Sequence, residues 1–352
     1  MNAVSSARAI SFRILQGVHA GGHASAILRQ ETAALDSRDA ALAETLVFGC
    51  LRYQSQLDFL IVHFSGRSQP KLDLEVRIAL RLGIFQLRYL DRIPAHAAVA
   101  ESVELVKNAR KRSAAPFVNA VLRKVNREPV RWPDRATELA VPAWILDRWE
   151  RRFGREDATA IAQAALLEPE AYINSVTGRQ QDIGAQSIVP LLEIERGMTV
   201  LDLCAAPGNK TAQAIAAGGR VIAGDRYLQR LVDVLPAAAR VVLDAAEPLP
   251  FSTLFDRILI DAPCSGTGTL ARNPEIKWRL ELSDLPVFQA RQRKMIARAL
   301  PHLRPGGRLV YATCALEEEE NEAVVNDFAV IETRLRIPGR DPGDGFFAAV
   351  IK

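Results

Sequence analysis

The sequence predicts an all-helical N-terminal domain followed by an α/β domain built on a parallel sheet. Apolar residues recur at helical spacing through the first 126 residues, and no alternating Val/Ile/Thr-rich segment interrupts them. From about residue 185, short apolar runs alternate with helical patterns, which is typical of βαβ units. A chain of 352 residues is long enough for two such domains.

The helical domain is predicted over residues 1–126. Its helices are expected at residues 7–18, 39–51, 74–90, 97–109 and 116–125, where apolar residues are three or four positions apart. Residues 127–141 carry prolines among charged residues and predict a linker. Two helical stretches follow, at about 142–153 and 156–167. We therefore assign residues 127–170 to a linker with short helices.

The α/β domain is predicted over residues 171–352. Its strands are expected at residues 199–203, 220–225, 240–244, 257–261 and 308–314. Ligands of parallel sheets bind beyond the carboxyl ends of the strands. The residues that end these strands are Asp202, Asp225, Asp244, Asp261 and Cys314. We therefore expect them to lie along one edge of the sheet.

The loop after the first strand reads Asp-Leu-Cys-Ala-Ala-Pro-Gly-Asn-Lys-Thr over residues 202–211. It contains neither the dinucleotide fingerprint nor the P-loop pattern, although its small residues allow a ligand to approach the backbone. Asp225 ends the next strand, at a spacing that suits a ribose diol. Asp244 is placed to accept a hydrogen bond from an exocyclic amine such as that of adenine.

Four cysteines are scattered without a C-x-x-C pair, which predicts neither a disulfide scaffold nor a metal site. Cys50 and Cys204 are interpreted as core thiols. Cys264 and Cys314 both follow predicted strands and should meet at the same edge of the sheet. A thiolate there, with basic neighbours, is expected to have a lowered pKa, as a nucleophile requires.

Charge and hydrophobicity limit which partners and which cellular location the sequence can predict. The formal net charge of +4 is compatible with RNA binding without indicating it. No apolar run approaches the roughly 18–20 residues that span a membrane, and the N-terminus lacks a secretion signal. We expect a cytoplasmic protein with no membrane partner, and we expect a monomer.

Four segments of the α/β domain resemble the RNA cytosine-5 methyltransferases. They are Asp202–Gly208, Asp-Ala-Pro-Cys-Ser-Gly-Thr-Gly from Asp261, Asn-Pro-Glu-Ile-Lys-Trp from Asn273, and Tyr-Ala-Thr-Cys314 followed by Glu-Glu-Glu-Asn321. The N-terminal domain is similar to the NusB fold, an RNA-binding module. This pairing resembles the bacterial 16S ribosomal RNA cytosine-5 methyltransferase B family, and residues 344–348 are similar to its closing strand. The resemblance implies a Rossmann-like class I methyltransferase domain that uses S-adenosyl-L-methionine.

The resemblance also implies a role for each site residue. Cys314 would attack C6 of the cytosine, and Cys264 would help to remove the C5 proton or release the enzyme. Asp261 would hold the N3/N4 edge of a single-stranded or flipped-out base. The implied cofactor-binding residues are Cys204, Ala205, Ala206, Pro207, Gly208, Asn209, Lys210, Asp225, Asp244 and Asp261. Lys210 would contact either the cofactor or the substrate, or stand in solvent at the start of a helix.

The chain departs from the family pattern in two places. Asn209 stands where the family has a second glycine, and Asn is expected to tolerate a left-handed conformation there. The RNA-binding segment that the family has between about residues 170 and 185 is short. These departures leave two alternatives open: a cytosine-5 methyltransferase for another RNA such as tRNA, or a non-catalytic RNA-binding or assembly factor with a weakened cofactor site.

Overall fold

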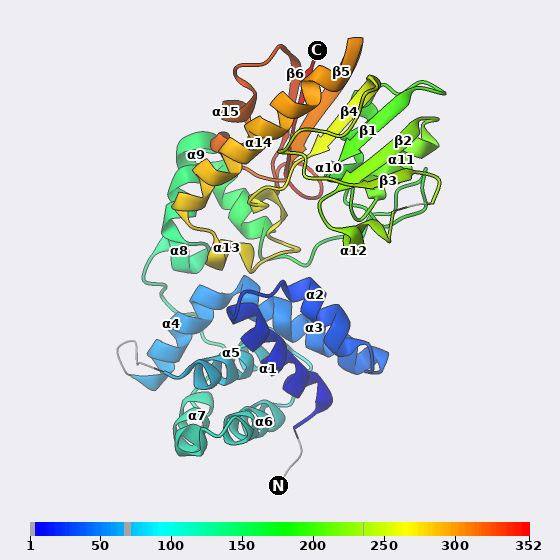
Figure 1. Cartoon of the computed structure of the whole chain (residues 1–352). Coiled ribbons are helices and arrows are strands. Elements are labelled where there is room, and N and C mark those ends of the chain that lie inside the picture. The colour runs from blue at the N-terminus through cyan, green and yellow to red at the C-terminus, as the bar shows by residue number, and fades with distance from the viewer. Residues whose placement is uncertain (1–3, 67–71, 235) are drawn as a thin grey trace. The chain divides into compact units, whose positions relative to one another are not determined.

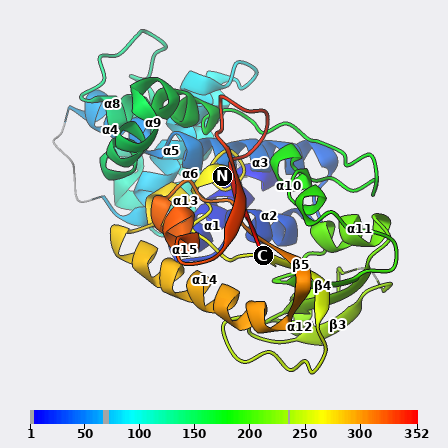
Figure 2. The same ribbon diagram turned by 90° about the horizontal axis from the view of Figure 1, so that it is seen from above.

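A computed structural model describes residues 4–66, 72–234 and 236–352 (Figures 1 and 2). Contacts between Cα atoms group the chain into two compact units. One comprises Met1–Arg148 with Asn273–Trp278, and the other comprises Trp149–Arg272 with Arg279–Lys352. This grouping differs from the predicted three-part division, because the first unit extends beyond residue 126 and includes a short segment from the second half of the sequence.

The first unit is helical, as predicted. Its helices are α1 (Ser6–His19), α2 (Ala24–Thr32), α3 (Ser37–Arg52), α4 (Gln54–Ser65), α5 (Leu74–Tyr89), α6 (Ala95–Asn108), α7 (Ala115–Leu122) and α8 (Arg135–Glu138). The sequence patterns located five of these and missed three: α2, α4 and the four-residue α8, which lies in the predicted linker. Helix α2 buries only two residues, and only Tyr53 separates α4 from α3. No helix among the described residues is both long and apolar enough to cross a membrane.

The contact between α3 and α5 depends on a glycine. A Cβ atom on Gly49 of α3 would lie 1.9 Å from the ring of Phe85 in α5, so only glycine lets these helices approach. The thiol of Cys50 lies in the same apolar core and is 1% exposed, as expected of a core thiol.

The Asn273–Trp278 segment satisfies helix ends in the first unit. The carboxylate of Glu275 accepts a hydrogen bond from Ala24 N–H at the start of α2, at 3.0 Å. The Lys277 ammonium group donates to the Arg52 carbonyl at 2.8 Å, and the Trp278 indole donates to the Leu51 carbonyl at 2.6 Å. These carbonyls belong to the last turn of α3, whose acceptors have no partner within the helix. The segment therefore caps two helices.

The second unit contains a seven-stranded sheet with the order β3-β2-β1-β4-β5-β7-β6. The strands are β1 (Thr199–Leu203), β2 (Arg220–Asp225), β3 (Ala239–Val242), β4 (Phe255–Asp261), β5 (Leu303–Thr313), β6 (Val330–Arg336) and β7 (Phe346–Ile351). Strands β1 to β5 are parallel, whereas β7 runs antiparallel between β5 and β6. This is the Rossmann-like class I methyltransferase arrangement that the sequence predicts.

Helix α14 (Leu285–Ala299) packs on one face of the sheet and α11 (Asn209–Ala216) on the other (Figures 1 and 2). The remaining helices of this half of the chain are α9 (Ala143–Ala164), α10 (Ile183–Gln186), α12 (Leu228–Leu231), α13 (Ile276–Arg279) and α15 (Glu322–Val325); most of α13 and the start of α9 are assigned to the first unit. Because side chains alternate along a strand, Leu201 packs on the α14 side of the sheet and Val200 on the α11 side. Gly154 is non-helical inside α9, so α9 consists of the two helical stretches expected there.

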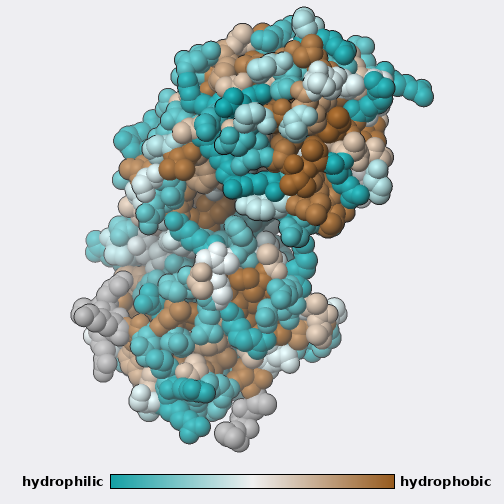
Figure 3. All heavy atoms as spheres, in the orientation of Figure 1, coloured by the Kyte–Doolittle hydropathy of each residue, from teal (hydrophilic) through white to brown (hydrophobic). Residues whose placement is uncertain are grey.

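The edges of the sheet were the hardest part to predict. Strand β6 was missed because an edge strand with many exposed positions has no clear apolar pattern. At the other edge, α12 is the only helix among the described residues of the connection between β2 and β3, and it has four residues. Apolar side chains reach the surface in this region (Figure 3), and they include Leu228, Val232 and Val242.

Candidate active site

The loop after β1 turns sharply before α11. Cys204 and Gly208 both have a positive φ, of 63° and 99°, and α11 begins at the next residue, Asn209. A Cβ atom on Gly208 would lie 2.9 Å from Cα of Val234, so this position requires glycine for space as well as for conformation. Asn209 is the first residue of α11, so the tolerance of asparagine for a left-handed conformation is not needed here; Gly208 adopts that conformation instead. The Asn209 amide instead donates to the Gln180 carbonyl at 3.2 Å.

A cavity of about 310 Å³ lies at the carboxyl edge of the sheet beside this loop. Seven of the predicted site residues line it, namely Cys204, Ala205, Ala206, Pro207, Asn209, Lys210 and Asp261. Asp202 lines it as well, and the Thr211 hydroxyl donates to the Asp202 carboxylate at 2.5 Å. Burial raises the pKa of Asp202 to about 7.

The other two predicted carboxylates lie outside the lining of this cavity. Asp225 is 4% exposed and accepts hydrogen bonds from Ala206 N–H at 3.4 Å and Tyr227 N–H at 3.1 Å. Asp244 lies within 3.3 Å of the Arg291 guanidinium group and accepts from a backbone N–H two residues further on. Both therefore lie at the expected edge of the sheet, and Asp225 is joined directly to the loop after β1.

Lys210 and Asp261 form an ion pair in the cavity. Their Nζ and Oδ2 atoms are 2.7 Å apart, and the ammonium group lies 5.3 Å from the centre of the Phe346 ring. Burial opposes the charge on Lys210, but the Asp261 carboxylate outweighs it and the pKa of the lysine is raised. The Lys210 side chain is only 11% exposed. This excludes the alternative that Lys210 stands in solvent at the start of a helix.

The thiols of Cys264 and Cys314 meet, as the strand ends predicted. Their Sγ atoms are 3.4 Å apart although the residues are 50 positions apart in sequence. The expectation of a lowered pKa was wrong for Cys264, because the hydrogen bond to Cys314 and burial raise its pKa well above the ordinary value. Burial also raises the pKa of Cys204, which packs against the core beneath the site.

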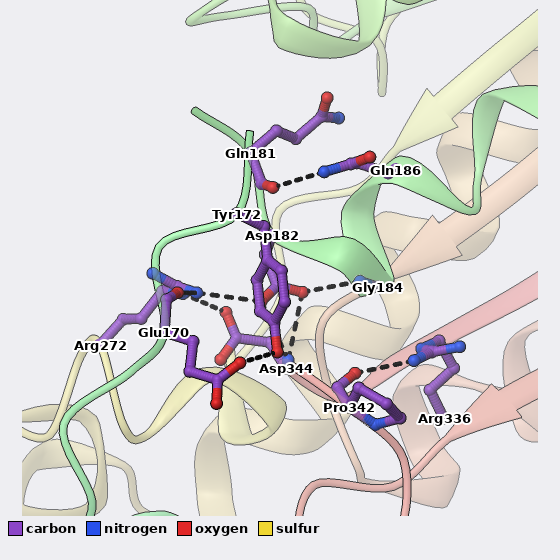
Figure 4. A network of polar contacts seen from close by, with 10 residues as sticks. All are labelled: Glu170, Tyr172, Gln181, Asp182, Gly184, Gln186, Arg272, Arg336, Pro342 and Asp344. Atoms are coloured by element: carbon purple, nitrogen blue, oxygen red, sulfur yellow. Dashed lines mark hydrogen bonds and ion pairs between the residues drawn. The ribbon is translucent and has the colours of Figure 1, made fainter. Parts of the chain in front are cut away.

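Sequence patterns missed a polar network beside the cavity (Figure 4). Arg272 contacts Asp344 at 2.7 Å and Asp182 at 3.0 Å, and it also donates to the Glu170 carbonyl. Burial and the Asp182 carboxylate raise the pKa of Asp344 to about 6. Arg272 lines both the cavity described above and a second one of about 300 Å³, which also involves Tyr172. These residues come from separate loops with no shared spacing, so no sequence pattern connected them.

The chain matches the family model described as 16S rRNA methyltransferase RsmB/F over residues 189–337 and the NusB family model over residues 5–127. Ribosomal RNA small subunit methyltransferase B from Erwinia tasmaniensis is 31% identical over 425 residues, covering 99% of both chains. The protein of that name from Escherichia coli is 31% identical over 409 residues, covering 95% of both. The crystal structure of PH0851 has the same fold, with a TM-score of 0.81, 18% identity and coverage of 100% of this chain and 99% of that one.

The order of the strands, the glycine turn after β1 and the cavity at the carboxyl edge of the sheet together define this chain as a class I S-adenosylmethionine-dependent methyltransferase. The chain belongs to the 16S rRNA methyltransferase RsmB/F family, and its N-terminal region belongs to the NusB family. It is accordingly a methyltransferase that acts on RNA.

The cavity fits the cofactor of this class. S-adenosylmethionine carries a sulfonium and an ammonium cation, and the cavity lining contains the carboxylates of Asp202 and Asp261. Oδ1 of Asp202 is buried and has no hydrogen-bond partner among the described residues, so it is an acceptor available to a cation. Small side chains in the loop after β1 let a ligand approach the backbone.

Proposed function

We propose that this chain transfers a methyl group to C5 of a cytosine in 16S ribosomal RNA. The observation that carries the proposal is the pair of thiols, 3.4 Å apart, at the same sheet edge as the ion pair of Lys210 and Asp261. The Cys314 sulfur also contributes to the raised pKa of Lys210, which supports a single site for the thiols and the ion pair. C5 of cytosine is a weak nucleophile, and a thiol that adds to C6 makes it reactive.

Cys314 is the proposed nucleophile. Its thiolate would form a bond to C6, and the electrons of the C5–C6 double bond would then be available to C5. Asp261 would hold the N3/N4 edge of the base, where the adduct is protonated, and Lys210 would hold the Asp261 carboxylate in place. The bound cofactor supplies the methyl group that C5 accepts.

Cys264 is proposed to serve in product release. After methylation, C5 must lose its proton so that the double bond can reform and the Cys314–C6 bond can break. Cys264 is placed for this step because its sulfur lies 3.4 Å from that of Cys314. The residues that would hold the cofactor are those of the loop from Cys204 to Lys210, together with Asp225 and Asp244.

Labelled cofactor and small-subunit RNA would test this proposal. We expect Cys314→Ala to abolish transfer and Cys264→Ala to accumulate a covalent protein–RNA complex on a denaturing gel. Cys50→Ala is the matched control, because it removes a thiol from the core of the first unit and should leave labelling unchanged. Undiminished labelling by Cys314→Ala would rule out the mechanism.

The RNA target is the finer part of the proposal. The relatives named small-subunit methyltransferases and the NusB-family region support 16S ribosomal RNA. Alignments of 409 and 425 positions exceed this 352-residue chain, so the relatives contain segments that it lacks. That shortening favours, as a second candidate, methylation of another RNA such as tRNA. A map of 5-methylcytosine in the RNA of a deletion strain separates the two.

A non-catalytic binding factor is the remaining alternative. The two adjacent thiols and the Lys210–Asp261 pair support the enzyme instead, because RNA binding alone requires neither. Calorimetry with S-adenosylmethionine distinguishes them: absence of a binding signal would favour the binding factor.

A further inference from the structure

Two neighbouring residues, Glu320 and Asn321, each contact the loop of a different active-site thiol. Both are fully buried. Glu320 ends the short helix η6 (Glu318–Glu320), and Asn321 follows it directly. Glu320 contacts the loop of Cys264, the residue proposed for release, whereas Asn321 contacts the loop of Cys314, the proposed nucleophile.

Glu320 acts on the loop of Cys264 together with Gln292 of α14. Oε2 of Glu320 accepts a hydrogen bond from Ser265 N–H at 2.8 Å. The Gln292 amide donates both to this Oε2 atom, at 3.1 Å, and to the Pro263 carbonyl, at 3.0 Å. The carbonyl before Cys264 and the N–H after it are therefore held by one buried pair of side chains.

These two contacts fix the direction of the Cys264 side chain. The Pro263 carbonyl belongs to the peptide group before Cys264, and Ser265 N–H belongs to the one after it. Because peptide groups are planar, holding both of them fixes φ and ψ of Cys264 and hence the direction of its Cα–Cβ bond. The pair is itself anchored, since the Tyr311 hydroxyl donates to the Glu320 carbonyl at 2.6 Å.

Asn321 holds the loop of Cys314 through the two residues that flank this cysteine. Its Oδ1 atom accepts from the Thr313 hydroxyl at 2.6 Å, and its Nδ2 atom donates to the Ala315 carbonyl at 2.9 Å. Thr313 and Ala315 flank Cys314 in sequence. Adjacent residues of one short segment thus hold the flanks of both thiols.

The polar character of these buried residues needs a reason beyond stability. Burial raises the pKa of Glu320, which shows that its charged form is disfavoured there. An apolar residue of similar size would fill the space without that cost. Polar groups in a core do, however, fix one geometry, whereas apolar packing tolerates small shifts.

We propose that Glu320, with Gln292, and Asn321 are positioning residues that set the separation of the two thiols, Glu320 for release and Asn321 for attack. This inference rests on the proposed function, because it assigns the two thiols to different steps. A misplacement of about 1 Å can cost about 10²-fold in rate. Loss of either contact therefore slows one step and spares the other.

The test compares one round of methyl transfer with steady-state turnover. Gln292→Met removes both amide hydrogen bonds at nearly constant volume. It should lower steady-state turnover by about tenfold or more and raise the fraction of covalent protein–RNA complex, while the single-turnover rate of methyl transfer and KM change by less than about threefold. Glu320→Gln keeps an acceptor for Ser265 N–H and should behave like the wild type, whereas Glu320→Met should behave like Gln292→Met.

Asn321→Leu should affect the attack step instead of the release step. It should slow single-turnover methyl transfer by about tenfold or more and form little covalent complex. Glu318→Gln is the matched control, since Glu318 lies in the same segment but is exposed. Melting temperatures identify any variant that merely unfolds; if Gln292→Met does so, Glu320→Met replaces it, with Glu320→Gln as its conservative control.

A double-mutant cycle separates this inference from the proposed function. If the pair acts through Cys264, Gln292→Met adds less than about twofold to the defect of Cys264→Ala, because both changes remove the same contribution. Independent, multiplicative defects would overturn the inference. So would equal losses of single-turnover and steady-state rates. If Cys264→Ala accumulates no covalent complex, or Cys314→Ala remains active, it is the proposed function that fails.

Discussion

Asp202 links the stability of the α/β unit to pH. Its side chain is buried at the carboxyl end of β1, and burial raises its pKa to about 7. Replacement by asparagine keeps an oxygen that can accept the Thr211 hydroxyl and removes the group that ionises. Asp202→Asn therefore isolates the cost of burying the charge.

The magnitude follows from proton linkage. A tenfold change in an acid constant corresponds to about 1.4 kcal/mol, so a pKa of about 7 in the folded chain against an ordinary value of 3.8 corresponds to about 4 kcal/mol. Between about pH 4 and 7 the folded chain keeps a proton that the unfolded chain releases. Rising pH therefore lowers the free energy of unfolding across this window. We expect Asp202→Asn to be more stable than the wild type by up to about 4 kcal/mol at pH 8, with almost no difference at pH 4.

Urea unfolding followed by circular dichroism, at pH 4, 6 and 8, measures this difference. Asp256→Asn is a control of opposite sign. The backbone N–H and the hydroxyl of Thr199 donate to Asp256 and lower the pKa of its carboxyl group, so its charged form stabilises the fold above that pKa. Asp256→Asn should thus reduce stability at pH 8. If Asp202→Asn is less stable than the wild type at pH 8, or shows the same pH dependence, the reasoning is refuted.

Three further predictions concern other parts of the chain. Gly208→Ala should weaken cofactor binding by about tenfold or more in calorimetry, because a φ of 99° strains alanine. Asn209→Gly should change the affinity by less than about threefold, and comparable losses of affinity in the two variants would contradict this reasoning. Arg272→Met should lower the free energy of unfolding by about 3 kcal/mol at pH 8, because it leaves the Asp344 carboxylate without its partner. The loss should be smaller at pH 5, where Asp344, with a pKa of about 6, is protonated. Equal losses at both pH values would contradict the prediction. Burial lowers the pKa of Lys277 to about 7, so the folded chain releases this proton at a lower pH than the unfolded chain and the wild type gains stability between pH 7 and 10. The melting temperature of Lys277→Met should rise less over this range, and a parallel rise would contradict the lowered pKa.

The meeting of Cys264 and Cys314 could be predicted because it depends only on topology. Each residue follows a strand, and parallel strands bring their carboxyl ends to one edge of a sheet whatever their separation in sequence. The same reasoning located Asp225 and Asp261. The raised pKa of Cys264 could not be predicted in this way, since it depends on the depth of burial and on the 3.4 Å contact between the sulfur atoms.

Glu320 shows why the supporting residues escaped sequence reasoning. A run of four glutamates, Glu317 to Glu320, is typical of a solvated segment, and Glu318 is exposed. Glu320 is nevertheless fully buried, because its partner Gln292 lies on α14 and their contact has no local sequence signature. The contact of Arg272 with Asp344 escaped for the same reason, since it joins two loops 72 positions apart.

The buried acids make opposite demands on stability and activity. Asp202, Glu320 and Asp344 all have raised pKa values, so each favours the folded state more strongly as the pH falls. Asp202 also lines the cavity that would hold the cofactor, and its unpaired Oδ1 atom is the acceptor proposed for a cation, so its ionised form would serve binding while its burial costs stability. A site in which acids are buried beside a reactive thiol sacrifices stability near neutral pH, and Asp202→Asn should recover part of it.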